Sequence, residues 1–162
     1  MNSQEMDWVD HIRKRPGMYV GVINERGLVR LIQACMGVMI DEFSAREVEL
    51  VELGSQQYVL HFKELSGSIP SDFATLNGSE YHIPAPFFEM AVLNALAVRF
   101  AWTLMTPVGE EIQQTYLKGK AKESEKDKTF VEVTEVKLTF ELDTDIWRSD
   151  FRFLWDYLQR EI

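Results

Sequence analysis

The sequence predicts a two-layer α/β sandwich of the α+β type, in which helices cover one face of a mixed, largely antiparallel sheet. Two observations lead to this fold class. One long segment beginning near residue 28 carries apolar residues at helical spacing, and several later segments alternate apolar and polar residues and are joined by short turns. The chain has 162 residues, 46% of them hydrophobic, so we expect a single domain over residues 1–162.

The N-terminal part predicts a short helix followed by a break. Residues 3–14 carry apolar residues at helical spacing behind Ser3, which is a suitable N-cap. Pro16–Gly17 is expected to end this helix. We then expect an extended piece over Met18–Val22 and a polar turn over Asn24–Gly27.

The clearest pattern in the chain is one apolar stripe along a helix that we expect over Leu28–Ala45. Such a helix has about five turns. A stripe confined to one side is typical of a helix that packs on a sheet. The members of the stripe are Leu28, Leu31, Ile32, Cys35, Met39, Ile40 and Phe43.

Two strands are expected directly after this helix, over Glu47–Leu53 and Gln57–Lys63. Gly54–Ser55 lies between them as a tight turn, which makes the pair an antiparallel hairpin. Ser66–Pro70 is expected to end the second strand, and residues 71–86 form a polar connection bounded by prolines.

The second half of the chain predicts a helix, three strands and a final helix. In order these are a helix over Phe87–Val98, strands over Arg99–Thr106, Glu111–Leu117 and Thr129–Leu142, and a helix over Ser149–Ile162. Turns at Pro107–Gly109 and a charged loop over Gly119–Lys128 join the strands. The expected apolar anchors of the long strand are Phe130, Val136, Leu138 and Phe140.

Composition argues against several classes of site. One cysteine, Cys35, leaves no disulfide framework, and the three histidines have no metal-ligand spacing, so no metal site is expected. The formal charge of −9 argues against direct nucleic-acid binding. The basic run Arg13–Arg15 is the exception. We expect it to be a solvated turn that anchors a helix to the sheet, with a phosphate contact as the alternative.

The sequence also gives an expectation about where in the cell the protein is located. The first residues lack a basic segment followed by an apolar core, so no signal peptide is expected. The longest apolar region, Pro84–Met105, is interrupted by Glu89, Asn94 and Arg99, so no membrane span is expected. We therefore expect a cytoplasmic protein.

Residues 13–21 read RKRPGMYVG, and the long helix that follows ends in Ile40-Asp41-Glu42. With several collinear segments, this pattern resembles the ATPase domain of gyrase B and its type II topoisomerase relatives, within the wider GHKL ATPase family. Weaker matches are ELSGSIP at 64–70 and VLNALA at 92–97. The resemblance implies the GHKL, or Bergerat-like, fold and a site for ATP and Mg²⁺.

The long helix departs from the family pattern at the positions that do chemistry. The resemblance implies a Glu that polarises the attacking water and an Asn that holds Mg²⁺, and these positions are Ala34 and Val38 here. Alanine has no base, and valine offers no oxygen to a hard cation. Asp41 and Glu42 keep the final pair of the motif. A polar last turn of the helix is the plainer interpretation of these two residues.

The second motif is altered too. The Asp that reads the adenine amino group corresponds to Leu65, and the motif glycines correspond to Ser66 and Ser68. Only Ile69 and Pro70 remain. A leucine cannot accept the hydrogen bond that selects adenine.

The glycine-rich lid that the resemblance implies is replaced by Ile83-Pro84-Ala85-Pro86-Phe87-Phe88. This stretch has no glycine that would let the backbone approach phosphates closely. Phe87 and Phe88 are suitable plugs for the old pocket, and they are equally suitable as walls of an apolar pocket for another ligand.

The resulting hypothesis is a non-catalytic, gyrase-B-like pseudo-ATPase that acts by protein interaction or dimerisation, with no ATP or Mg²⁺ cofactor. The partner classes it suggests are a second copy, a topoisomerase or another GHKL protein. One alternative is a divergent domain that still binds ATP or ADP, through Asp41, Glu42, Ile69 and Pro70. A third hypothesis is a small-ligand binder that uses the remodelled pocket.

Overall fold

The computed structural model describes residues 8–54, 56–70, 87–121 and 130–147. Some predictions lie outside the described residues. These are the start of the first helix, the connection over 71–86, most of the charged loop and the helix over 149–162.

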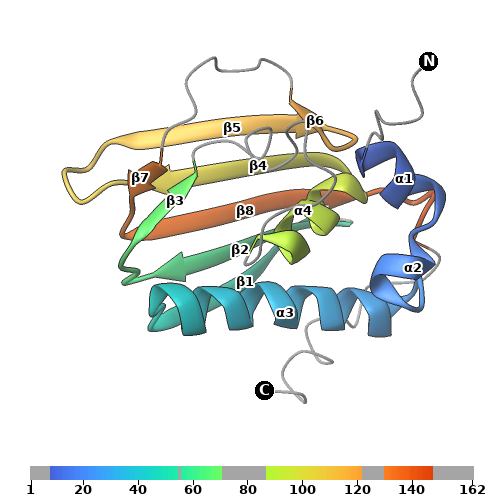
Figure 1. Cartoon of the computed structure of the whole chain (residues 1–162), viewed down its shortest axis with the longest axis horizontal. Coiled ribbons are helices and arrows are strands. Elements are labelled where there is room, and N and C mark those ends of the chain that lie inside the picture. Colours follow the sequence, from blue (N-terminus) through green and yellow to red (C-terminus); the bar gives the residue numbers. More distant parts are fainter. Residues whose placement is uncertain (1–7, 55, 71–86, 122–129, 148–162) are drawn as a thin grey trace.

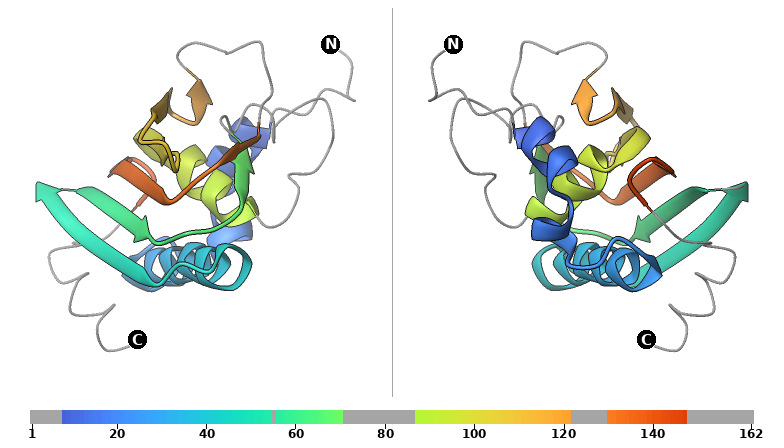
Figure 2. Two further views of the ribbon diagram at one scale, coloured as in Figure 1. Left: turned by 90° about the vertical axis from the view of Figure 1, so that its left-hand side faces the viewer. Right: turned by 90° about the vertical axis from the view of Figure 1, so that its right-hand side faces the viewer.

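The chain forms two layers, with the helices on one face of a sheet (Figures 1 and 2). The sheet has six strands in the order β1-β2-β8-β4-β5-β6, and β3 and β7 form a separate pair. The strands are β1 Glu47–Gly54, β2 Gln57–Lys63, β3 Ser68–Pro70, β4 Ala97–Met105, β5 Glu111–Leu117, β6 Lys120–Ala121, β7 Phe130–Glu132 and β8 Glu135–Leu142. The helices are α1 Trp8–Lys14, α2 Gly17–Val20, α3 Glu25–Phe43 and α4 Phe88–Ala95.

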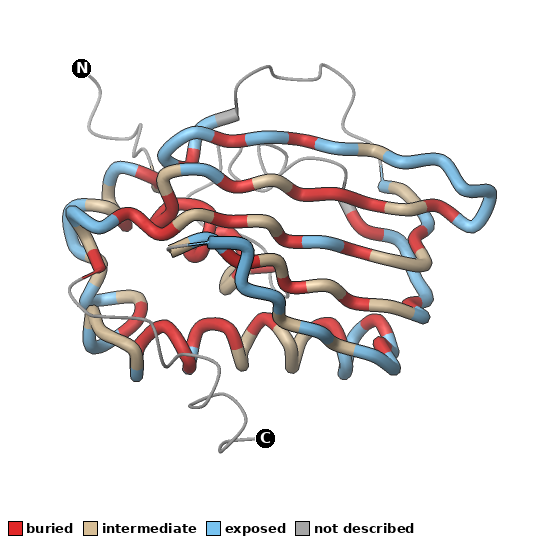
Figure 3. Tube along the Cα trace, turned by 180° about the vertical axis from the view of Figure 1, so that it is seen from behind, coloured by how far each residue is buried: buried red, intermediate tan, exposed pale blue. Residues whose placement is uncertain are grey.

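Every pairing among the described strands is antiparallel, so the predicted α+β sandwich is confirmed and the parallel pairs of a mixed sheet are not seen within these ranges. The hydrophobic core contains rows of side chains aligned across the central strands of the sheet. Leu60, Leu138 and Trp102 are aligned on neighbouring strands and are all buried toward the helices. The opposite face carries mostly charged and polar residues, with Val51, Val59, Ala101 and Met105 among them, and Figure 3 looks onto that face.

The predicted extended piece over Met18–Val22 is wrong, because the chain there forms the short helix α2. Pro16 already has helical dihedral angles, with φ −61° and ψ −32°. Its carbonyl accepts bonds from the amides of Tyr19 and Val20, at 2.9 and 3.0 Å. Gly21 then ends the turn with φ +80°.

The long helix begins three residues earlier than predicted. The Asn24 side chain accepts hydrogen bonds from the backbone amides of Arg26 and Gly27, which satisfies two of the first free N–H groups. The helix ends at Phe43, where Ser44 adopts a left-handed conformation. One member of the predicted stripe is misplaced, since Ile40 is 45% exposed.

The predicted single strand over Thr129–Leu142 is split. β7 pairs with β3, whereas β8 lies between β2 and β4. Between β7 and β8, the Val133 amide donates to Gly67 O at 3.1 Å and the Thr134 amide donates to Met105 O at 2.8 Å. Phe130 is therefore no core anchor, and its side chain is 64% exposed. Ser68–Pro70 is likewise a separate strand rather than the end of β2.

The remaining elements agree with prediction within a few residues. The β1–β2 hairpin, α4, β4 and β5 all occur where the patterns place them. Among the described helices, none is long and apolar enough to cross a membrane.

Candidate functional site

Helix α3 carries the first group of predicted site positions, but it does not bring them into one pocket. Ala34 lines a cavity of about 240 Å³ between α2, α3 and α4. Val38, one turn further along, is partly buried against the core. Asp41 and Glu42 are exposed and do not line that cavity. The polar last turn of the helix is the simpler description of these two carboxylates.

The second group lies in the connection from β2 to β3. Leu65 is buried, and its amide donates to Thr134 O at 3.0 Å. The Ser66 amide donates to Phe43 O at 2.9 Å, and Ser68 is exposed on β3. Ile69 is fully buried in the core, so its side chain cannot contact a ligand without moving the core. Pro70 is the last residue of β3.

Leu65 and Ser66 line an open hollow of about 660 Å³ that does not include Ala34. Ala34 and Leu65 thus line different hollows, and Val38, Asp41 and Glu42 line neither of them. The described residues also line a third hollow, of about 480 Å³, on the face of the sheet away from the helices. None of the predicted site residues lines it.

Aromatic packing occupies the space between the two motif regions. Phe87 is 5% exposed, and its ring centroid lies 5.7 Å from that of Phe43 at the end of α3. A Cβ atom on Gly67 would lie 3.0 Å from Phe43 Cδ1, so the β2–β3 connection also packs closely on this ring. Phe87 is thus part of the packed core at the end of α3. Phe88 instead lines the Ala34 cavity and lies 6.1 Å from the Tyr19 ring.

The charged groups at the Ala34 cavity are Arg30 on α3 and Glu89 on α4. Tyr19 forms its aromatic wall, and its hydroxyl is hydrogen-bonded to His11 Nδ1. Burial raises the pKa of Tyr19. Arg30 and Glu89 were not predicted as site residues, because nothing in the local sequence pattern shows that α4 folds back beside this part of α3.

Cys35 follows Ala34 on α3 and is fully buried. Burial, together with the charge of Glu89, raises the pKa of its thiol far above the ordinary value. The thiol therefore stays protonated and is a poor nucleophile. Among the described residues, no group of three or more His, Cys, Asp or Glu could hold a metal ion.

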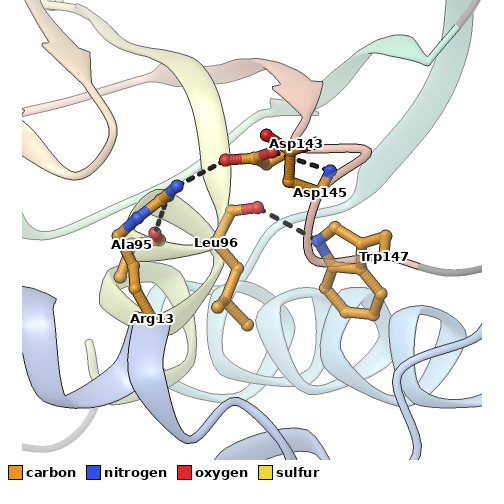
Figure 4. Close-up of polar contacts among 6 residues, drawn as sticks. All are labelled: Arg13, Ala95, Leu96, Asp143, Asp145 and Trp147. Carbon is orange, nitrogen blue, oxygen red and sulfur yellow. Dashed lines mark hydrogen bonds and ion pairs between the residues drawn. The ribbon is translucent and has the colours of Figure 1, made fainter.

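The first arginine of the basic run has the anchoring role that was expected (Figure 4). Arg13 Nη1 donates to Ala95 O at 2.8 Å, and Nη2 forms an ion pair with the buried Asp143. Trp147 Nε1 donates to Leu96 O at 3.1 Å beside it. These contacts tie α1 and the end of β8 to the end of α4, whereas Lys14 and Arg15 are exposed.

Comparison with known proteins identifies the class of fold. No protein-family model matches the chain. The chain is 27% identical over 171 residues to gyrase B of Streptomyces coelicolor, a match that covers 91% of this chain and 25% of that protein. It is 40% identical over 48 residues to the novobiocin-resistant gyrase B of Streptomyces niveus, covering 30% of this chain and 7% of that protein.

Two solved gyrase B structures also resemble this chain in fold. Gyrase B from Myxococcus xanthus superposes with a TM-score of 0.67 at 20% identity, covering 87% of this chain and 44% of that chain. The 43K ATPase domain of Thermus thermophilus gyrase B, solved with an aminocoumarin, gives a TM-score of 0.63 at 18% identity. That match covers 88% of this chain and 41% of that one.

The fold is therefore the α+β fold of the gyrase B ATPase domain, of the GHKL type. The resemblance inferred from the RKRPGMYVG segment and the helix after it is confirmed, and the chain is a gyrase-B-like domain. It spans about a quarter of the length of the Streptomyces coelicolor protein and less than half of the two solved chains.

Proposed function

We propose that this chain is a non-catalytic, gyrase-B-like domain, a pseudo-ATPase that acts in the cytoplasm by binding a protein partner or a second copy of itself. The observation that carries the proposal is the state of the motif positions. Ala34 provides no base, Leu65 is buried, and Phe87 packs on Phe43 between the two motif regions.

Two magnitudes support the absence of turnover. Loss of a positioned general base alone typically slows a reaction by ~10²–10⁴. The Ala34 cavity, at about 240 Å³, is smaller than the roughly 300–1,000 Å³ of ordinary ligand pockets. A nucleotide with its metal would require Phe88 or the neighbouring helices to move.

The test is a thermal-unfolding measurement with ATP or ADP, each with Mg²⁺, at about 1 mM, alongside a phosphate-release assay. We expect no shift and no release. A ligand at ~100 times its dissociation constant stabilises a fold by ~2.7 kcal/mol. For a chain of this size that corresponds to a rise of roughly 5–10 °C. A rise of that size, or release above the background, would refute the proposal.

The matched control is Ala34→Phe, which fills the cavity. Any nucleotide-induced shift that comes from the cavity should vanish in this variant, whatever the variant does to the melting temperature itself. A shift that persists in Ala34→Phe comes from binding elsewhere on the chain.

A second function is favoured by one observation, the presence of both Arg30 and Glu89 in the lining of an aromatic-walled cavity. These groups could hold a small ligand with both an acidic and a basic group, or a nucleotide bound in an altered way. In that case the thermal shift appears without phosphate release, and Arg30→Ala and Glu89→Ala each reduce it.

A further inference from the structure

We propose that the free edge of β1 is a docking site for an extended segment of a protein partner, one that adds a strand to the sheet and carries basic residues at alternate positions. The inference rests on the proposed function, because it names the surface and the kind of partner through which a non-catalytic domain would act. Three properties of β1 support it.

The first property is an unpaired edge. Among the described residues, β1 pairs only with β2, in register from Glu47 opposite Lys63 to Gly54 opposite Gln57. The β1–β2 hairpin extends past the helical layer (Figure 2), and among the described residues no strand lies along the outer edge of β1. An edge strand of eight residues presents a row of unpaired N–H and C=O groups, and these pair readily with another strand.

The second property is an incomplete core. Val48 and Leu50 point to the helix side of the sheet, because they are aligned with the fully buried Phe62 and Leu60 of β2. Val48 and Leu50 themselves are only partly buried. An added strand with apolar side chains on this side would cover Val48 and Leu50.

The opposite edge of the sheet shows this feature to a smaller extent. On β5 the inward-facing Gln114 and Tyr116 are buried, and Ile112 is partly buried. The end of β5 is also paired with β6. On β1 both inward-facing apolar residues are only partly buried, so the apolar layer is less complete on the β1 side.

The third property is charge. On the face away from the helices β1 carries Glu47 and Glu49, two residues apart, whereas Glu52 lies on the helix side opposite Tyr58. The strand has no basic residue. Glu47 faces Lys63 across the hairpin, but Glu49 faces His61, whose pKa burial lowers so that the ring is mostly neutral at pH 7. Opposite charges aligned on neighbouring strands attract, and like charges repel. The carboxylates thus favour an incoming strand with lysine or arginine at every second position, and they disfavour pairing with a second copy of β1.

The probe is a labelled peptide, acetyl-TKVKVKVT-amide, whose binding is followed by fluorescence anisotropy. We expect binding that weakens about tenfold in Glu47→Lys/Glu49→Lys, the size expected when about 1.4 kcal/mol of charge pairing is lost. Both positions are exposed, so the variant should fold. The charge-matched control, Glu110→Lys/Asp145→Lys, changes two exposed carboxylates away from β1 and should bind the peptide as the wild type does.

Backbone methylation separates strand addition from simple charge attraction. Two peptides carry N-methyl groups on alternate residues, one on each edge of the extended chain. Methylation of the edge that pairs with β1 should abolish binding, and methylation of the other edge should leave it unchanged. Equal binding of the two methylated peptides would overturn the proposal, as would equal binding of the peptide by wild type and Glu47→Lys/Glu49→Lys.

The outcomes remain distinct from those of the nucleotide test. No peptide binding, with no nucleotide shift, would refute the β1 site and leave the non-catalytic function standing. Phosphate release would refute that function whatever the peptide does. A concentration-dependent dimer that Glu47→Lys/Glu49→Lys changes would assign the edge to a second copy instead, and so refute the basic partner.

Discussion

Arg13 shows how one side chain holds distant segments together. It joins α1 to the last turn of α4 and to Asp143, which lies 130 residues away. Asp143 is 3% exposed, so its carboxylate is surrounded by Arg13 and the Asp145 amide rather than by solvent. A buried carboxylate that loses its cation leaves an uncompensated charge, and this costs far more than the pair contributes when intact.

We therefore predict that Arg13→Ala lowers the free energy of unfolding by about 3 kcal/mol, the lower end of the range for breaking a buried pair, because Arg13 keeps some solvent contact. Urea unfolding followed by tryptophan fluorescence measures the change. Arg15→Ala, at an exposed position in the same basic run, is the control and should change it by less than about 0.5 kcal/mol. Equal effects in the two variants would contradict the anchoring role.

At the scale of the element, α3 contains two glycines with opposite requirements. A Cβ on Gly27 would lie 1.7 Å from Val22 O, so the connection from α2 crosses the helix at a point that only glycine allows. Gly37 has nothing within 4 Å of such a Cβ. The same substitution in one helix should therefore have effects of opposite sign.

We predict that Gly37→Ala raises the free energy of unfolding by about 0.5–1 kcal/mol, since alanine has the higher helix propensity. Gly27→Ala should lower it by about 3 kcal/mol, because backbone must move to remove the overlap. Melting temperatures of the two variants measure this difference. If Gly27→Ala proved neutral, α2 and α3 could not be packed as described.

The β strands show a second lesson at this scale. β7 and β8 follow one another, yet they belong to different sheets because Val133 and Thr134 take partners from two other connections. The apolar positions change phase here, from Val131 and Val133 to Val136 and Leu138, so the break itself leaves a trace in the sequence. Alternation does not name the neighbouring strand, so the partner of β7 could not be predicted, whereas the partner in the β1–β2 hairpin could, since it is adjacent in the chain.

At the scale of the whole molecule, His61 couples stability to pH. It lies on the open face of the sheet, where burial lowers its pKa and Glu135, with Oε1 3.8 Å from Nε2, only partly opposes the shift. The folded chain therefore binds fewer protons than the unfolded chain, whose histidine titrates near its ordinary value of about 6.5.

It follows that this contribution to stability is complete above pH 6.5 and is lost as the pH falls from there toward the lowered pKa. We predict that the urea midpoint decreases between pH 7.5 and 5.5, with a shallower decrease in His61→Gln. Identical slopes for the two proteins would show that other groups, such as carboxylates, set the pH dependence. Measurements at constant ionic strength remove the screening contribution.

The candidate site was only partly predictable. The spacing of residues after the RKRPGMYVG segment located Ala34, and the structure places this residue at a cavity. It also suggested that Phe87 or Phe88 fills or lines a pocket. Phe87 packs on Phe43, and Phe88 lines the Ala34 cavity. Arg30 and Glu89 were missed because they line one cavity only when α4 packs on α3.

The fold class, the long helix and the hairpin strands could be predicted from the sequence, and so could the residue types at the motif positions, such as Ala34 and Val38. All of these depend on residue identity or on spacing within one segment. The tertiary structure decided which strands pair, which partner Arg13 takes, and that Ala34 and Leu65 line separate hollows. These features depend on contacts between segments far apart in the chain, and no local pattern encodes such contacts.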